Sequence, residues 1–275
     1  MNRLITLILI LLVCFIPACS PRSEQYTELE SRLVDAADMR FILIQVDHGE
    51  VTILESNGDH VEIGGQVLFA DKLEYQVKST EKQISIKVFA HRDSFSNPPL
   101  RVIIHIPSQM QLKVETDNAS VFVRDYQDDL EVASTSGNIT IEQVFGKLTL
   151  RSNRGNIIVR ESSGIISVVG NYGALTLQNV SGETAASTIM GNVVFGGLVR
   201  VGDTVRLETD HGSVSVNLSQ DSALSIQVRS TSGDVACMLP GIISSTRACD
   251  GEIGSDGGML SIRTVSGAVT LQLIP

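Results

Sequence analysis

The chain has 275 residues and a formal net charge of −10, with 31 Asp and Glu against 21 Lys and Arg. Binding to nucleic acid needs clustered Lys and Arg, and the sequence has no such cluster, so we expect no nucleic-acid partner. Glycine is frequent, with 23 residues, tryptophan is absent and β-branched residues dominate, which suits an all-β repeat protein.

The N-terminus begins with one Arg and an apolar run from Leu4 to Ile16, a pattern typical of a secretory signal. Residues 16–19, Ile-Pro-Ala-Cys, resemble the lipobox of bacterial lipoproteins. That resemblance implies a signal peptide over residues 1–18 and a diacylated Cys19 that anchors the chain in a membrane. We therefore expect a location in the cell envelope outside the cytoplasm, at the outer membrane or the outer face of the cytoplasmic membrane. Plain secretion and an uncleaved anchor are the alternatives.

Two less regular segments follow. Residues 19–38 are polar and charged, and we predict a lipidated tether there, with a short helix from Glu28 to Ala37. Residues 39–106 alternate like half-buried strands but lack a strict period. A solenoid needs an atypical end to shield its first open edge, so this segment is predicted to be an N-terminal β cap.

A strict repeat then runs from Leu112 to Phe195. Its template is apolar, any, apolar, any, Ser or Thr, any two residues, Gly, any, apolar, any, apolar. The glycines of this template lie 18 residues apart, with Ala119 in the first copy: Gly137, Gly155, Gly173 and Gly191. A second series falls halfway between them: Gly146, Gly164 and Gly182.

Apolar residues two apart share one face of a strand, and a fixed period of this size is the signature of a solenoid. We predict a right-handed parallel β-helix or flattened β-roll over residues 107–275, with two strands per coil. Coils should hold about 18 to 21 residues, because Gly191, Gly212 and Gly233 lie 21 apart. The last template copy, ending at Leu271, is expected to close the C-terminal edge.

Two polar features of the repeat have structural interpretations. Glycine is expected to supply the positive φ of tight turns. Asn138, Asn156 and Asn192 follow the glycine directly, and we interpret this column as a ladder that hydrogen-bonds from coil to coil.

One outward column of the repeat is a candidate docking stripe. Its members are apolar residues and threonines: Phe122, Thr140, Ile158, Thr176 and Val194. Left exposed, such a stripe would mark a docking surface. Covered, it would pack against the cap or another strand.

The remaining candidates concern cysteines and acidic residues. An oxidising envelope favours a disulfide between Cys237 and Cys249, with a buried free thiol at Cys237 as the alternative. The acidic residues at 250, 252 and 256 lack the ligand run of a calcium loop, and the histidines are scattered. We expect no metal and no cofactor.

The strings TSGNITI, TDHGSVSV and STSGDVAC, with an Ile-Pro or Leu-Pro dipeptide before the repeats begin or resume, carry a family resemblance. They resemble the bacterial "putative adhesin" family, a β-strand-repeat domain of unknown function. The head domains of "putative autotransporter adhesins" are similar in layout. The resemblance covers Phe41 to Leu271. It implies an extracytoplasmic right-handed β-helix and supplies no catalytic residues.

The leading hypothesis is a non-catalytic, membrane-tethered binding or adhesion module whose ligand is an unidentified protein or glycan. One alternative is an envelope-signalling or sensor component. Another is a polysaccharide-active enzyme that uses carboxylates from neighbouring coils, with Glu131 and Glu142 as the residues to change.

Overall fold

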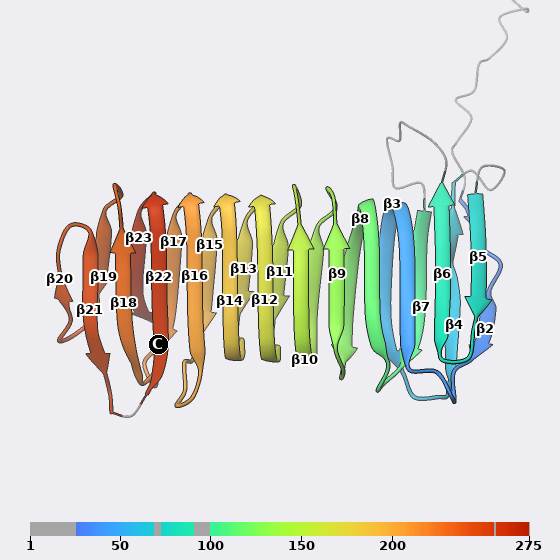
Figure 1. Ribbon diagram of the computed structural model, residues 1–275, viewed down its shortest axis with the longest axis horizontal. Helices are drawn as coiled ribbons and strands as arrows, with labels where there is room; N and C mark the ends of the chain where they lie inside the picture. The colour runs from blue at the N-terminus through green and yellow to red at the C-terminus, as the bar shows by residue number, and fades with distance from the viewer. Residues whose placement is uncertain (1–25, 69–72, 91–99, 256, 275) are drawn as a thin grey trace, which may run out of the picture.

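The computed structural model describes residues 26–68, 73–90, 100–255 and 257–274. Within these ranges the chain is all-β and winds into a β-solenoid, which confirms the predicted fold class (Figure 1). The predicted signal peptide and Cys19 lie outside the described residues. In the described ranges, no helix has the length and apolar character that a membrane crossing requires.

The strands lie in two layers on either side of one core, and in the regular repeat the chain passes from one layer to the other at each turn (Figure 1). Three long strands bend from one sheet into the other: β3 (Phe41–Ser56), β8 (Gln111–Tyr126) and β10 (Ile139–Ser152). The front sheet holds the first halves of β3 and β8, the second half of β10, β5 (Leu73–Ser79), β6 (Gln83–Ala90), β9 (Leu130–Ser134), β12 (Ser163–Tyr172), β14 (Ser181–Met190), β16 (Thr204–His211), β18 (Leu224–Ser230), β20 (Ile243–Ser244), β21 (Ala248–Ile253) and β22 (Gly258–Ser266).

The back sheet lies behind it. It holds the other halves of the three long strands, β1 (Thr27–Glu28), β2 (Arg32–Asp35), β4 (His60–Val67), β7 (Leu100–Pro107), β11 (Ile157–Arg160), β13 (Leu175–Gln178), β15 (Val193–Gly197), β17 (Val214–Ser219), β19 (Val235–Met238) and β23 (Val269–Ile274).

Neighbouring strands of the repeat are parallel and paired at a register of 18 residues. Leu148 lies between Leu130 and Ile166 in the front sheet, and Ile157 pairs with Ile139 in the back sheet. These five side chains are all buried. Because every coil repeats the same register, the aliphatic columns of the template stack into one continuous core.

Serine at the Ser or Thr position of the template closes the turn on the inside of the fold. Ser152 Oγ accepts a hydrogen bond from the backbone N–H of Gly155 at 2.8 Å and donates to the carbonyl of Gly137 at 3.4 Å. Ser134 and Ser230 accept from the glycine three residues later in the same way. The spacing Ser-x-x-Gly is therefore a hydrogen-bonded unit, a role that the sequence pattern alone does not reveal.

The glycines of the first series are required by close backbone contact. A Cβ on Gly155 would collide with the carbonyl oxygen of Gly137, and a Cβ on Gly173 would collide with that of Gly155. This stack continues through both regular and irregular coils: Gly137, Gly155, Gly173, Gly191, Gly212, Gly267 and Gly233.

The expected positive φ belongs to the second series. Gly164, for example, has φ +130°, and it also touches the backbone of Gly146 in the coil before. Three residues before the glycine, a residue other than glycine adopts the left-handed backbone conformation, as Glu161 does with φ 50°. The same left-handed position recurs every 18 residues, at Asp125, Gln143, Glu161 and Asn179.

The asparagine column joins successive coils, with the backbone as its partner. Asn138 Oδ1 accepts from the N–H of Asn156 at 2.9 Å, and Asn156 Oδ1 accepts from the N–H of Ala174 at 2.9 Å. Asn192 does the same for Ser213. Each amide therefore binds the main chain of the next coil, which is why alanine is tolerated at position 174.

The N-terminal end differs from the expected tether and cap. β1 and β2 pair antiparallel with β4, so residues 27–35 belong to the fold, and the helix predicted from Glu28 is wrong. β3 is itself a coil of the solenoid, between β8 and the strands β6 and β7. The guanidinium of Arg32 lies 4.5 Å from the centre of the Tyr75 ring and joins β2 to β5 across this end.

At the C-terminal end, too, the strands are not stacked in the order in which they follow one another along the chain. β22 pairs with both β16 and β18, and β23 pairs with both β17 and β19, so the last template copy lies inside the stack and does not close the edge. The edge is made by β20 and β21 in the front sheet, where β21 is antiparallel to β18, and by β19 in the back sheet. A disulfide between Cys237 on β19 and Cys249 on β21 ties the two sheets together there.

Replacing Gly155 by alanine should lower the free energy of unfolding by about 3 kcal/mol or more, because backbone atoms of two coils must separate to admit the methyl group. Gly64→Ala is the matched control, since nothing lies within 4 Å of a Cβ built there. Denaturant unfolding of the two variants measures the difference. Equal stability would contradict the close-contact explanation.

Removing the disulfide with the double variant Cys237→Ala, Cys249→Ala should destabilise the C-terminal end by about 3 kcal/mol, the value typical of a short closed loop. Coils of a solenoid depend mainly on their neighbours, so the effect should be local. Hydrogen exchange should accelerate in β18 to β21 and stay unchanged in β9 to β12. Uniform acceleration along the whole chain would be inconsistent with this.

Candidate binding surface

The docking stripe predicted from the sequence lies on the outer face of the back sheet. Its residues pair in register, Phe122 with Thr140, Ile158 with Thr176, and Thr176 with Val194. Every member is half-buried. The stripe is thus a continuous column packed between its neighbours, and it offers no hollow.

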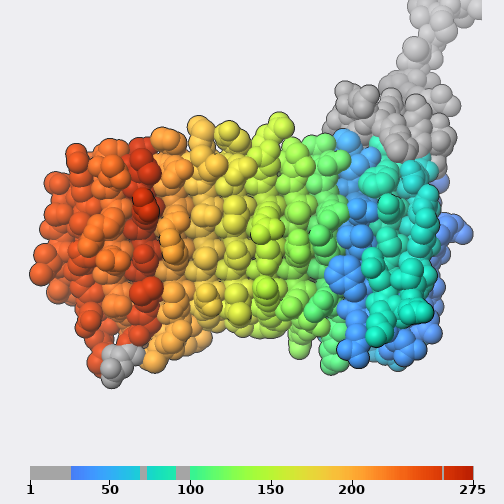
Figure 2. Space-filling model, in the orientation of Figure 1, coloured from blue at the N-terminus to red at the C-terminus, as the bar shows by residue number. Residues whose placement is uncertain are grey.

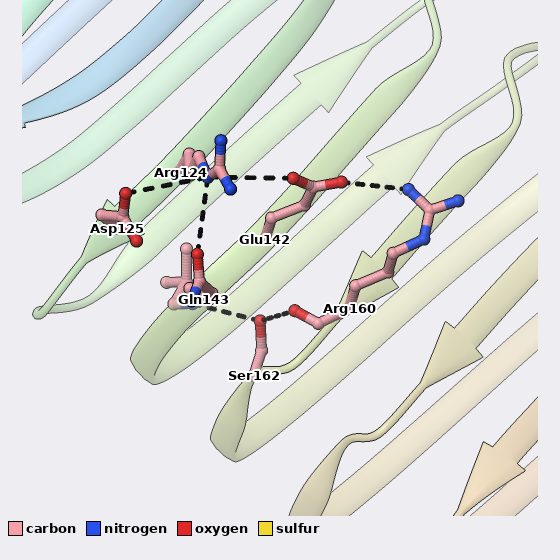
Figure 3. Close-up of polar contacts among 7 residues, drawn as sticks. Arg124, Asp125, Glu142, Gln143, Arg160 and Ser162 are labelled. Carbon is pink, nitrogen blue, oxygen red and sulfur yellow. Dashed lines mark hydrogen bonds and ion pairs between the residues drawn. The ribbon is translucent and has the colours of Figure 1, made fainter.

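A column of charged residues beside the stripe is paired within the chain. Arg160 Nη1 lies 3.0 Å from Glu142 Oε1, and Arg124 Nε lies 4.0 Å from Glu142 on the other side. Figure 3 shows these three side chains in line across the coils, with Ser162 bonded to the carbonyl of Arg160 beneath them. Asp125 Oδ2 lies 3.7 Å from Arg124 Nε and supplies the second negative charge. Because these charges are balanced locally, the back face is better suited to holding coils together than to binding a ligand.

The front sheet carries an open groove of about 530 Å³, within the usual range for ligand sites. Its walls come from consecutive strands, so segments up to 126 residues apart in sequence meet in it (Gln45 to Asn171). The outward side chains that line it are Gln45, Phe89, Glu115, Asp117, Ala133, Thr135, Arg151, Asn153, Val169 and Asn171.

One end of this groove holds a carboxylate fixed by two donors. Gln45 Nε2 donates to Glu115 Oε2 at 2.8 Å, and Lys113 Nζ lies 3.1 Å from Oε1. The hydrogen bond from Gln45, followed by that from Lys113, lowers the pKa of Glu115. Hydrogen bonding to Glu115 also raises the pKa of Lys113, with Glu131 adding to the effect. The groove therefore presents a fixed negative charge at neutral pH.

Arg151 is the cation of the groove. Its side chain is exposed, and no carboxylate of the described residues pairs with it. Two residues further along β10 and its turn, Asn153 Oδ1 accepts from Asn171 Nδ2 at 2.9 Å, which fixes both amides at the groove wall. An unpaired guanidinium beside oriented amides can bind a carboxylate, a phosphate or a hydroxyl-rich ligand.

Exposed apolar side chains adjoin the groove on β12 and β14. Ile165 is 51% exposed and Ile189 45%, with Val169 between them. Tyr172 and Met190, which pair in register at the end of these strands, are each more than half exposed. Figure 2 shows this face of the molecule, a broad wall built by successive coils. A patch of this kind marks a contact surface.

The alternation predicts the outward docking stripe, which lies on the back face, but it does not single out Arg151 or the front patch as a binding surface. The alternation of apolar and polar residues predicts which side chains point outward. Which of these side chains share a sheet depends on where the chain bends at each corner. The same geometry separates Glu131, on the front sheet, from Glu142, on the back sheet. These two carboxylates therefore do not face a common substrate. Residue 256 lies outside the described ranges, and no group of three metal-ligating side chains occurs within them.

Comparisons with known proteins agree on the fold. A "putative adhesin" from Bacteroides fragilis matches with a TM-score of 0.50 at 12% identity, over 90% of this chain and 99% of its own. One from Parabacteroides distasonis matches with a TM-score of 0.49 at 14% identity, over 90% and 98%. A search of curated proteins gives no match.

Both structural neighbours carry names of adhesins and not of enzymes. The match to the Bacteroides fragilis protein, at 12% identity, shows the fold alone. The family comparison is more direct. The model of the Toastrack DUF4097 domain matches residues 39–272, nearly the whole described part of the chain. The chain therefore belongs to the Toastrack DUF4097 family.

Proposed function

We propose that this protein is an adhesin-like binding module that acts without catalysis through the outer face of its front sheet. The observation that carries the proposal is Arg151, an exposed cation without an ion pair in the described part of the chain, set in an open groove beside the oriented amides of Asn153 and Asn171. Exposed apolar residues extend the same surface across β12 and β14.

The proposed setting is the cell envelope outside the cytoplasm, with the chain held by a lipid on Cys19. The lipobox-like residues 16–19 support the anchor, and the names of the structural neighbours support an envelope or extracellular location. The disulfide between Cys237 and Cys249 fits an oxidising compartment. A stiff solenoid would then hold its front face at a fixed distance from the membrane.

Replacing Arg151 by alanine tests this proposal. Full chain carrying Arg151→Ala should bind at least about tenfold more weakly to whatever the unaltered chain selects from a panel of envelope glycans, envelope proteins and the chain itself. The loss is expected because the guanidinium is the one cation without an ion pair among the described residues that line the groove. Binding is measured by surface plasmon resonance.

Arg124→Ala on the back face is the matched control, and it should leave binding unchanged. Equal binding by both variants would place the ligand elsewhere on the molecule. Turnover of any glycan in the panel by the unaltered chain would end the non-catalytic proposal.

A further inference from the structure

We propose that the partner of the front face is a second copy of this chain, docked face to face and antiparallel. This inference rests on the proposed function, because it names the ligand of the same surface. It is drawn from the order of charges along the front sheet and from the size of the face.

Arg263 apart, one outward column of the front sheet is antisymmetric in charge about its middle. In register from β8 to β18 the column reads Glu115, Ala133, Arg151, Val169, Ser187, Glu208, Arg263 and Arg229. Apolar and small residues occupy the centre, at β12 and β14. A negative and a positive charge lie on one side, and their opposites lie at the same distances on the other.

A two-fold axis parallel to the strands, between β12 and β14, brings these opposites together. It places Arg151 against Glu208 of the second copy, and Glu115 against Arg229 of the second copy. Each pair occurs twice in the dimer because the axis repeats it. Arg263 then faces Ala133, so no two like charges meet in this column.

The groups involved have capacity for these contacts. Glu208 accepts from Arg206 of its own chain through Oε1 alone, and Arg229 donates to Asp250 through Nη1 alone. A carboxylate has about four acceptor sites and a guanidinium five donors, so each keeps free sites for a partner. Arg151 has no ion pair within the described residues and gains one.

The apolar patch falls at the centre of the same interface. Val169 meets Ser187 of the second copy, and Ile165 and Ile189 lie on the two strands next to the axis. Ile165 also meets Glu183 of the second copy. That carboxylate stands at the start of β14, on the rim of the face, where it can reach solvent.

The face is large enough for a stable dimer. The column crosses eight strands, and at about 4.8 Å per strand and about 20 Å of strand length the face covers roughly 800 Å² per copy. A specific protein–protein interface of standard size buries about this area on each partner.

The axis also sets the direction of the two molecules. Rotation about a line parallel to the strands reverses the solenoid axis, so the N-terminal ends of the two copies lie at opposite ends of the pair. This arrangement is suited to two chains anchored on opposing surfaces, and it would make the module self-adhesive.

Sedimentation equilibrium of the full chain in detergent tests the inference. The unaltered chain should show a monomer–dimer equilibrium. Arg151→Glu and Glu208→Arg should each raise the dissociation constant at least about tenfold, since each substitution acts at two symmetric places. The double variant Arg151→Glu, Glu208→Arg should return to within about threefold of the unaltered chain, because the pair is restored with reversed charges.

Arg124→Glu, the same charge reversal on the back face, should leave the dissociation constant unchanged. A chain that stays monomeric at all concentrations overturns the inference, as does a double variant no tighter than the single ones. If such a monomer still binds a glycan or another protein through Arg151, the proposed function stands and only the self-association is lost.

Discussion

The structure depends on the contact between main chains at the glycine stack. At each turn of the stack a glycine α-carbon lies against a carbonyl oxygen of the neighbouring coil, that of Ala119 for Gly137 and that of another glycine in the other coils, too close for any side chain. A Ser three residues earlier accepts from the N–H of that glycine, as Ser152 does for Gly155, whereas Thr188 and Thr209 donate to the glycine carbonyl of the coil before. Neighbouring coils can therefore lie one strand spacing apart at their corners as well as along their strands.

This corner contact explains how the solenoid keeps its register where coil length changes. Between Gly191 and Gly212 the coil gains three residues, yet the glycine stack continues, and Thr209 donates to the carbonyl of Gly191. The extra residues lie in the loop before β16. Since a one-residue slip would turn the aliphatic columns outward, a fixed corner protects the core of every coil that follows.

The same regularity gives the outer faces their character. Each outward column repeats one position of the template, so charges and apolar groups form rows across the sheets. On the back sheet Glu142 and the neighbouring Asp125 balance the row of Arg124 and Arg160. On the front sheet the row through Arg151 leaves a charge unpaired within the described residues, and exposed aliphatic side chains stand beside it. A rigid face of this kind can bind a partner with little loss of conformational entropy.

The repeat, the all-β solenoid and the buried columns could be predicted from the amino-acid sequence, because period and alternation record which residues must share a face. The sequence also indicated the cysteine pair, which the structure joins. The order of the coils at both ends could not be predicted in this way. β3 enters beside β8 and β22 lies between β16 and β18 because strand pairing selects neighbours by register and not by chain order. The arrangement of side chains on the surface also depends on the fold, because the position of each corner determines which side chains of successive coils are neighbours. Glu131 and Glu142 therefore lie on opposite sheets, and Arg151 lies beside Val169.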